Sequence, residues 1–236
     1  MLTLEALSFA VHGKVLLSSM TSIIPDNALT CLIGANGAGK TTLLRILTGE
    51  LQATSGRFLI DHTDARSLSQ SQIAHHFSII PQDVQPPPHL TVLELVALGR
   101  FHPYGALWWR LSHRDHDIVD ACLNLCQVDQ LSERRVDQLS GGEQQRAWLA
   151  FGLAQEKRFL LLDETLGGLD VLAKQSFFKL LKQIASEGKG IVLTTHDLEL
   201  VADYADRVVV LSHGRITYEG PPNAHLHNFL TSNGRQ

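Results

Sequence analysis

The feature that most constrains this chain is residues 34–41, which read GANGAGKT. They match the pattern G-x-x-x-x-G-K-[ST] in full. An apolar run at 29–33 predicts a strand before them, and residues 42–47 predict a helix after them that stops at Gly49. Glycines let successive backbone N–H groups turn inward around an anion, and the helix adds its positive N-terminal end. The segment therefore predicts a phosphate-binding loop.

Two side chains of this loop carry chemistry of their own. Lys40 can reach the β and γ phosphates of a nucleotide, and Thr41 can place its hydroxyl on Mg²⁺. The loop residues expected to bind the nucleotide are Gly34, Asn36, Gly37, Gly39, Lys40, Thr41 and Thr42.

Composition excludes several classes of protein. Of the 236 residues, 44% are hydrophobic and 19% are charged, which is typical of an ordered globular chain. The net charge of −4 gives no general attraction to nucleic acid, so no nucleic-acid partner is expected. No run approaches the roughly 20 apolar residues that span a bilayer, and no signal peptide is evident. We expect a chain that is soluble by itself and reaches a membrane only through a partner.

The cysteines are few and odd in number. The three are Cys31, Cys122 and Cys126, a count that favours a reducing compartment over a disulfide scaffold. Cys122 and Cys126 are one helical turn apart, so a metal or redox pair is conceivable. Two buried small side chains are the favoured interpretation.

Strand and helix patterns alternate along the chain. Strands are predicted at 2–11, 57–60, 77–80, 159–162 and 191–195, with a hairpin over 207–218 that turns at 212–214. Residues 92–131 are mostly helical in pattern, with a polar interruption at 112–115, and a further helix follows Gly142. The pattern predicts an α/β fold, a P-loop NTPase core with a mostly parallel sheet, an N-terminal antiparallel β region and a helical subdomain. We expect one domain over 1–236, with its core at about 1–83 and 158–236 and its helical subdomain at about 84–157.

Two carboxylates follow a continuous apolar run. Residues 159–162 have the pattern of a buried parallel strand, and Asp163 and Glu164 come at its carboxyl end. Ligands bind at that end in open α/β sheets. Asp163 is suited to a Mg²⁺ shell, and Glu164 is suited to polarise an attacking water. A pair of solvated acids is the alternative, and it is improbable downstream of a complete phosphate loop.

A second phosphate-binding element is predicted at residues 139–145, which read LSGGEQQ. Ser140 and Glu143 have the spacing of a capping box, so they cap a helix. Ser140, Gly141, Gly142 and the helix N-terminus also form a possible anion site. The two elements are far apart in the chain, so a single nucleotide need not touch both in the same chain.

Together these motifs resemble the ATPase subunit of an ABC transporter. The resemblance covers essentially the whole chain, and it rests on residues 34–41, Gln82, 139–143, 159–164, Gly168-Leu169-Asp170 and His196. In that family two such domains pack head to tail. The signature motif of one, here LSGGE, closes on the γ-phosphate held by the other, so the dimer encloses two ATP molecules.

The resemblance also implies individual roles. Gln82 would sense Mg²⁺ and the attacking water, Asp170 would communicate across the dimer, and His196 would bond the γ-phosphate. The catalytic residues implied are Glu164, His196 and Gln82. The residues implied around Mg²⁺ are Thr41, Gln82 and Asp163. Beyond the loop, the residues implied in nucleotide binding are Ser140, Gly141, Gly142 and Asp170.

The chain departs from the family pattern in two places. Residues 163–170 read DETLGGLD where the family has D-E-P-T-S-x-L-D. Losing the proline and gaining glycines should loosen the segment, while both carboxylates and Asp170 remain. Residues 9–13 read FAVHG and contain no tyrosine to stack on adenine, so Val11 or His12 is expected to cover the base.

Residues 98–105 (LGRFHPYG) and 146–150 (RAWLA) resemble the ATPases of bacterial iron–siderophore, haem and cobalamin importers. That resemblance implies permease subunits as partners, a substrate-binding protein indirectly, and a peripheral place on the cytoplasmic face of the inner membrane. We expect the permease contact within residues 83–110, with Phe101 and Tyr104 in it. Two alternatives stay open, a soluble non-transport ABC ATPase and the ATPase of an efflux system.

Overall fold

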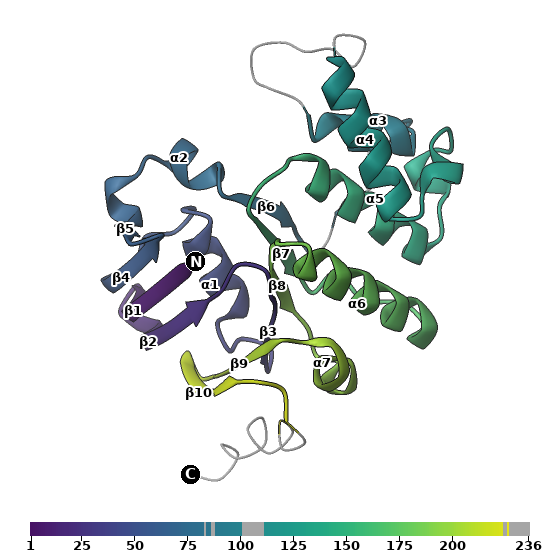
Figure 1. The fold of residues 1–236 in the computed structure, drawn as a ribbon. Coiled ribbons are helices and arrows are strands. Elements are labelled where there is room, and N and C mark those ends of the chain that lie inside the picture. The colour runs from purple at the N-terminus through teal and green to yellow at the C-terminus, as the bar shows by residue number, and fades with distance from the viewer. Residues whose placement is uncertain (83, 86–87, 101–110, 224–225, 227–236) are drawn as a thin grey trace.

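The computed structural model describes residues 1–82, 84–85, 88–100, 111–223 and 226 (Figure 1). The strands are β1 (Leu2–Val11), β2 (Lys14–Ile24), β3 (Leu29–Gly34), β4 (Ser55–Ile60), β5 (Thr63–Asp64), β6 (Phe77–Ile80), β7 (Phe159–Asp163), β8 (Gly190–Thr194), β9 (Arg207–Ser212) and β10 (Arg215–Gly220). The α-helices are α1 (Lys40–Leu47), α2 (Gln70–Ala74), α3 (Val92–Leu98), α4 (His113–Leu125), α5 (Gly141–Ala154), α6 (Val171–Ser186) and α7 (Leu198–Tyr204). Short 3₁₀ turns are η1 (Ala65–Ser67), η3 (Asp129–Leu131) and η4 (Val136–Gln138).

The strands form two sheets. A six-stranded sheet has the order β10-β9-β3-β8-β7-β6, and its strands are parallel except for the β9–β10 pair. A four-stranded antiparallel sheet has the order β2-β1-β4-β5. The predicted α/β class, with a mostly parallel sheet and an N-terminal antiparallel region, is confirmed.

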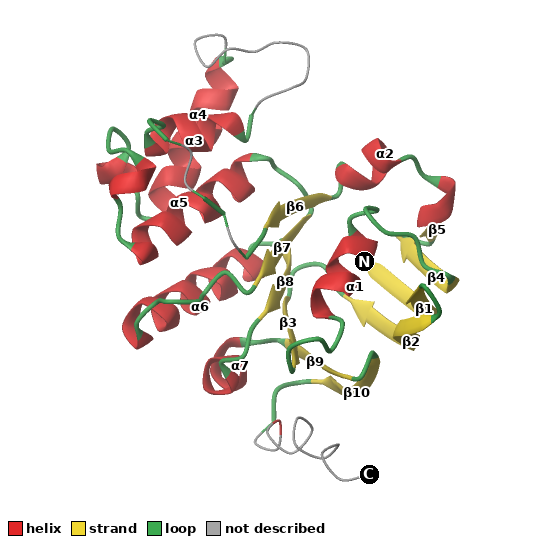
Figure 2. Cartoon of the chain, turned by 180° about the vertical axis from the view of Figure 1, so that it is seen from behind, coloured by secondary structure: helices red, strands yellow, loops and turns green. Residues whose placement is uncertain are grey.

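The parallel sheet separates two hydrophobic cores. In β7, Leu160 and Leu162 belong to one core, and Phe159 and Leu161 belong to the other. Both faces of this strand are therefore covered, which explains why its apolar run is continuous rather than alternating. Helix α1 lies between the two sheets, whereas α6 and α7 cover the opposite face of the parallel sheet (Figures 1 and 2).

The helical part of the chain packs beside β6. Helices α3, α4 and α5 contact one another, and α5 also contacts β6 (Figure 2). The polar residues 112–115 do not interrupt a helix but begin one, because Ser112 and Asp115 form the capping box of α4. Arg100, at the end of α3, bonds Asp115 of α4 and the carbonyl of Ala154 in α5. The boundaries of a subdomain at about 84 and 157 stay a proposal.

The predicted hairpin over 207–218 is confirmed as β9 and β10. Its turn residues His213 and Gly214 have φ of 47° and 73°, the left-handed values that a tight two-residue turn requires. Strand β2 had no counterpart among the predicted elements. Its alternation is broken at Ser19, which has φ 47° at an irregularity in the pairing with β1.

All three cysteines are free and buried. Burial raises the pKa of the Cys122 thiol to about 11, so this side chain is a protonated thiol near neutral pH. In the described part of the chain, no group of three or more His, Cys, Asp or Glu residues could hold a metal ion. The structure agrees with two buried small side chains. Among the same residues, no helix is long and apolar enough to cross a membrane.

A matched pair of leucines tests whether Leu161 is packed in the core between the two sheets. Leu161→Ala should lower the free energy of unfolding by about 2–5 kcal/mol, because Leu161 is 0% exposed and its removal leaves a cavity. Leu172→Ala should change it by no more than about 0.5 kcal/mol, because Leu172 is 76% exposed. Denaturant unfolding of both variants is the measurement. Equal effects would contradict the assignment.

Candidate nucleotide-binding site

The candidate site forms where three neighbouring parallel strands end. Leu32 of β3 pairs with Thr194 of β8, and Thr194 pairs with Asp163 of β7. The loop after β3 and the carboxylates after β7 therefore come to the same edge of the sheet. This is the edge at which open parallel sheets bind ligands.

Two glycines of the loop are required by their surroundings. A Cβ on Gly34 would lie 2.4 Å from the carbonyl oxygen of Leu211 in β9. Gly39, which precedes α1, has φ 107°, and a Cβ there would lie 2.5 Å from Cδ2 of Leu17. The loop is thus pressed against β9 on one side and β2 on the other, which holds it in place at the start of α1.

Lys40 is a buried cation with a carboxylate partner. Its side chain is 5% exposed, and its Nζ lies 3.1 Å from Oε1 of Glu164. The same nitrogen donates a 2.7 Å hydrogen bond to the carbonyl oxygen of Gly34. A buried charge is costly unless it is paired and bonded, so these contacts fix the ammonium at the loop.

Glu164 lies between two cationic or potentially cationic groups. Its Oε1 is 2.9 Å from Nε2 of His196 and also contacts Lys40. Burial alone would raise the pKa of Glu164, but the bonds to Lys40 and His196 outweigh it and hold that pKa below its usual range. Glu164 also has φ 45°, an uncommon value for a residue other than glycine, and its N–H donates to Thr194 Oγ1 at 2.7 Å. The carboxylate is therefore ionised and held in a defined position.

Asp163 is bonded on both of its oxygens. Thr41 Oγ1 donates to Oδ2 at 2.9 Å, and Thr194 Oγ1 donates to Oδ1 at 2.7 Å. A carboxylate beside a hydroxyl is an all-oxygen donor pair of the kind that Mg²⁺ prefers, so Thr41 and Asp163 fit this ion. When bound there with a nucleotide, Mg²⁺ would neutralise charge on the β and γ phosphates.

A cleft of about 430 Å³ opens over these groups. Its lining residues include the predicted Asn36, Gly37, Gly39, Lys40, Thr41, Thr42, Gln82 and Glu164. Lys14 and Leu16 of β2 also line it, and neither could be expected from the sequence while β2 was unpredicted. Val11 and His12, expected to cover the base, end β1 and begin the turn to β2, and they are not among the residues that line this cleft. Their role stays a proposal.

The remaining predicted residues lie elsewhere. Ser140, Gly141 and Gly142 form the N-terminus of α5, where Ser140 makes the expected capping box with Glu143. Asp170 caps α6 by accepting the N–H of Ala173 at 2.8 Å. None of these four residues lines the cleft around Lys40. The LSGGE element therefore lies outside the cleft that the phosphate loop lines.

Comparison with known proteins agrees with this arrangement. The model of the ABC transporter family matches residues 17–167, which include the phosphate loop, the LSGGE element and both carboxylates. The chain belongs to the ABC transporter ATP-binding family. Its activity as an ATPase follows from that membership and from the site described above.

The similarity to named members of this family covers most of the chain. The petrobactin import ATP-binding protein YclP of Bacillus subtilis is 37% identical over 89% of this chain and 82% of its own length. The ferric enterobactin transport ATP-binding protein FepC of Escherichia coli is 33% identical over 92% of this chain and 80% of its own. The dimeric structure of the bacterial ABC transporter cassette MJ0796 superposes with a TM-score of 0.78 at 26% identity, over 95% of this chain and all of that one.

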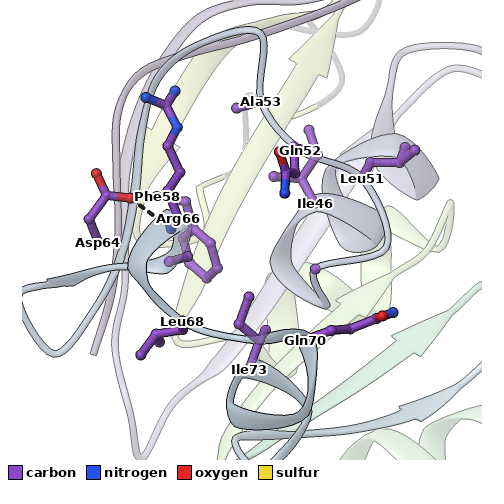
Figure 3. Close-up of a pocket in the computed structure, with 12 residues that line it drawn as sticks. Ile46, Leu51, Gln52, Ala53, Phe58, Asp64, Arg66, Leu68, Gln70 and Ile73 are labelled. Carbon is purple, nitrogen blue, oxygen red and sulfur yellow. Dashed lines mark hydrogen bonds between the residues drawn. The ribbon is translucent and has the colours of Figure 1, made fainter.

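A separate pocket of about 170 Å³ lies between α1, β4 and α2 (Figure 3). Its walls are mainly apolar, with Ile46, Phe58 and Ile73 among them. Asp64 lies near the pocket, but its carboxylate accepts the N–H of Arg66 and caps a 3₁₀ turn. This pocket contains none of the phosphate-loop residues, so it is not the nucleotide site.

Two buried threonines test the role of the Thr194 hydroxyl. Thr194→Val should lower the free energy of unfolding by about 1–3 kcal/mol, because it leaves Asp163 and the Glu164 N–H without their partner. Thr30→Val should be neutral or stabilising, because Thr30 is 1% exposed and its Oγ1 has no hydrogen-bond partner among the described residues. Thermal unfolding compares the two variants. A neutral Thr194→Val would refute the role given to this hydroxyl.

Proposed function

We propose that this chain is the ATP-hydrolysing subunit that powers import of a metal chelate through a partner permease. The observation that carries the proposal is the pairing of Lys40, Glu164 and His196 at the phosphate loop, together with an LSGGE element that lies outside the same cleft. The relatives support the import branch, because YclP is named for petrobactin import and FepC for ferric enterobactin transport.

Hydrolysis follows from what the site residues do when ATP binds. The phosphates attract Lys40, which then contacts them in place of Glu164. The freed carboxylate accepts a proton from water as the water oxygen attacks the γ-phosphorus. The bond from that phosphorus to the β,γ-bridging oxygen breaks, and ADP and inorganic phosphate form. His196 and Gln82 orient the γ-phosphate and the water, and Thr41 and Asp163 would hold Mg²⁺, which would supply positive charge beside the phosphates.

The signature motif acts on a second nucleotide. Ser140, Gly141 and Gly142 do not line the cleft of their own chain, so they contact ATP only if another subunit brings its phosphate loop to them. A head-to-tail dimer satisfies this for both sites at once. The likeness to a dimeric ABC cassette supports that assembly. ATP then stabilises the closed dimer, and loss of the γ-phosphate lets it open.

Import requires further partners. Permease subunits would receive the motion of the dimer, and a substrate-binding protein would deliver the chelate to them. This chain would then lie at the cytoplasmic face of the inner membrane as a peripheral subunit. We propose the permease contact within residues 83–110. Of that segment, residues 83, 86–87 and 101–110, with Phe101 and Tyr104, lie outside the described residues.

Replacing the proposed base tests the hydrolysis step. Glu164→Gln should lower the ATP turnover number by about 10²–10⁴-fold, because an amide cannot accept the proton. The variant should still bind ATP and should accumulate as a dimer on size exclusion. Glu187→Gln, a substitution at the far end of α6, is the matched control and should leave turnover unchanged. Near-normal turnover of Glu164→Gln would exclude this carboxylate as the base.

Co-purification from native membranes in mild detergent tests the transport role. A polytopic permease in fixed ratio to this chain is the expected result, and vesicles of that complex should move chelate toward the face that carries this subunit when ATP is supplied on that face. Recovery from the soluble fraction alone would favour a non-transport ABC ATPase. Export in the vesicle assay would assign the chain to an efflux system.

A further inference from the structure

An ion pair joins the start of α6 to the residue that follows His196. Lys174 Nζ lies 3.1 Å and 3.2 Å from the two carboxylate oxygens of Asp197. Lys174 is in the first turn of α6, and Asp197 directly follows His196. The side chains are 23% and 33% exposed, so the pair is partly shielded from water.

On the α6 side, the pair connects to the LSGGE element of the same chain. A Cβ on Gly141 would lie 3.4 Å from Leu169, and one on Gly142 would lie 3.7 Å from Ala173. Arg146 of α5 also donates a 2.8 Å hydrogen bond to Ser176 of α6. The start of α6 is therefore in contact with the element that completes the other subunit's site.

On the other side, the pair connects to the catalytic groups. His196 contacts Glu164, which contacts Lys40. A cavity of about 170 Å³ lies among these groups, lined by Gln82, Glu164, Lys174, His196 and Asp197 together with four neighbours. This cavity leaves room for the His196 side chain to move. The position of His196 is therefore set in part by its own contact with Glu164 and by the contact of its neighbour Asp197 with Lys174.

We propose that the Lys174–Asp197 ion pair couples the two nucleotide sites of the dimer, and that Lys174 is a positioning residue for this purpose. The proposal rests on the dimeric ATPase function given above. When the γ-phosphate draws His196 toward it, Asp197 moves with its neighbour and pulls on Lys174. The first turn of α6 then shifts against Gly141 and Gly142, which bind the nucleotide of the second site.

How much displacement the Lys174–Asp197 pair can transmit depends on its exposure to solvent and on how firmly each partner is held. A fully exposed ion pair contributes little to stability and would transmit little. Here both oxygens of Asp197 are within reach of one ammonium, and each partner is fixed by a helix start, since Asp197 precedes α7 and Lys174 follows the α6 cap at Asp170. A link between two rigid elements can transmit a displacement.

Cooperativity of ATP hydrolysis by the purified full chain is the direct test. Two coupled sites give a Hill coefficient approaching about 2. Lys174→Met should bring the coefficient toward 1, while binding of a fluorescent ATP analogue to the dilute, monomeric protein stays within twofold of wild type. Lys174→Arg, which keeps the charge, should restore the cooperativity. The double variant Lys174→Met with Asp197→Asn should have a Hill coefficient no lower than that of either single variant.

A second ion pair on the same helix supplies the control. Lys182, further along α6, pairs with Asp206, which accepts the N–H of Leu29 at the start of β3 rather than bonding Asp197. Lys182→Met should leave the Hill coefficient unchanged. Three results would overturn the coupling while the ATPase assignment stands. They are an unchanged Hill coefficient in Lys174→Met, a double variant whose coefficient falls by the sum of the two single effects, and a wild type that hydrolyses ATP without cooperativity. Absence of hydrolysis by the wild type would instead overturn the proposed function itself.

Discussion

A buried ammonium at the carboxyl edge of a parallel sheet organises this molecule. Lys40 is 5% exposed, and a cation so shielded is stable only beside an anion and bonded acceptors. Glu164 supplies the charge and the Gly34 carbonyl supplies an acceptor. For both to reach Lys40, β3 and β7 must end at the same level of the sheet, and β8 must hold them there through Thr194.

The two cores make that alignment rigid. The parallel strands β3, β7 and β8 are covered on both faces, so their ends cannot shift without disturbing packed side chains on two sides. The elements proposed to transmit motion are instead helices outside the sheet. The helical part packs beside β6, and α6 meets the site through side chains at its first turn. The parallel sheet thus holds the nucleotide in a fixed position, and the helices beside it carry the movement that ATP binding causes.

Much of this could be predicted from the sequence, because the strongest signals are local. The phosphate loop, the continuous run before Asp163 and the capping box at Ser140 each occupy a few adjacent residues, and all three appear as expected. Strand β2 was missed, because its alternation breaks at Ser19, and with it the cleft residues Lys14 and Leu16 were missed. The bonds of Thr194 and Lys174 could not be predicted from one sequence, since they join segments whose proximity only the folded sheet creates.

Hydrolysis requires Lys40 to exchange its carboxylate partner for phosphate, and a crystal structure with a non-hydrolysable ATP analogue and Mg²⁺ tests this exchange most directly. In that structure we expect Lys40 Nζ to contact the β and γ phosphates, and Thr41 and Asp163 to flank the ion. Glu164 should have left the ammonium and should face the γ-phosphorus through a water. A structure in which Lys40 and Glu164 remain paired while the phosphates bind elsewhere would contradict the exchange.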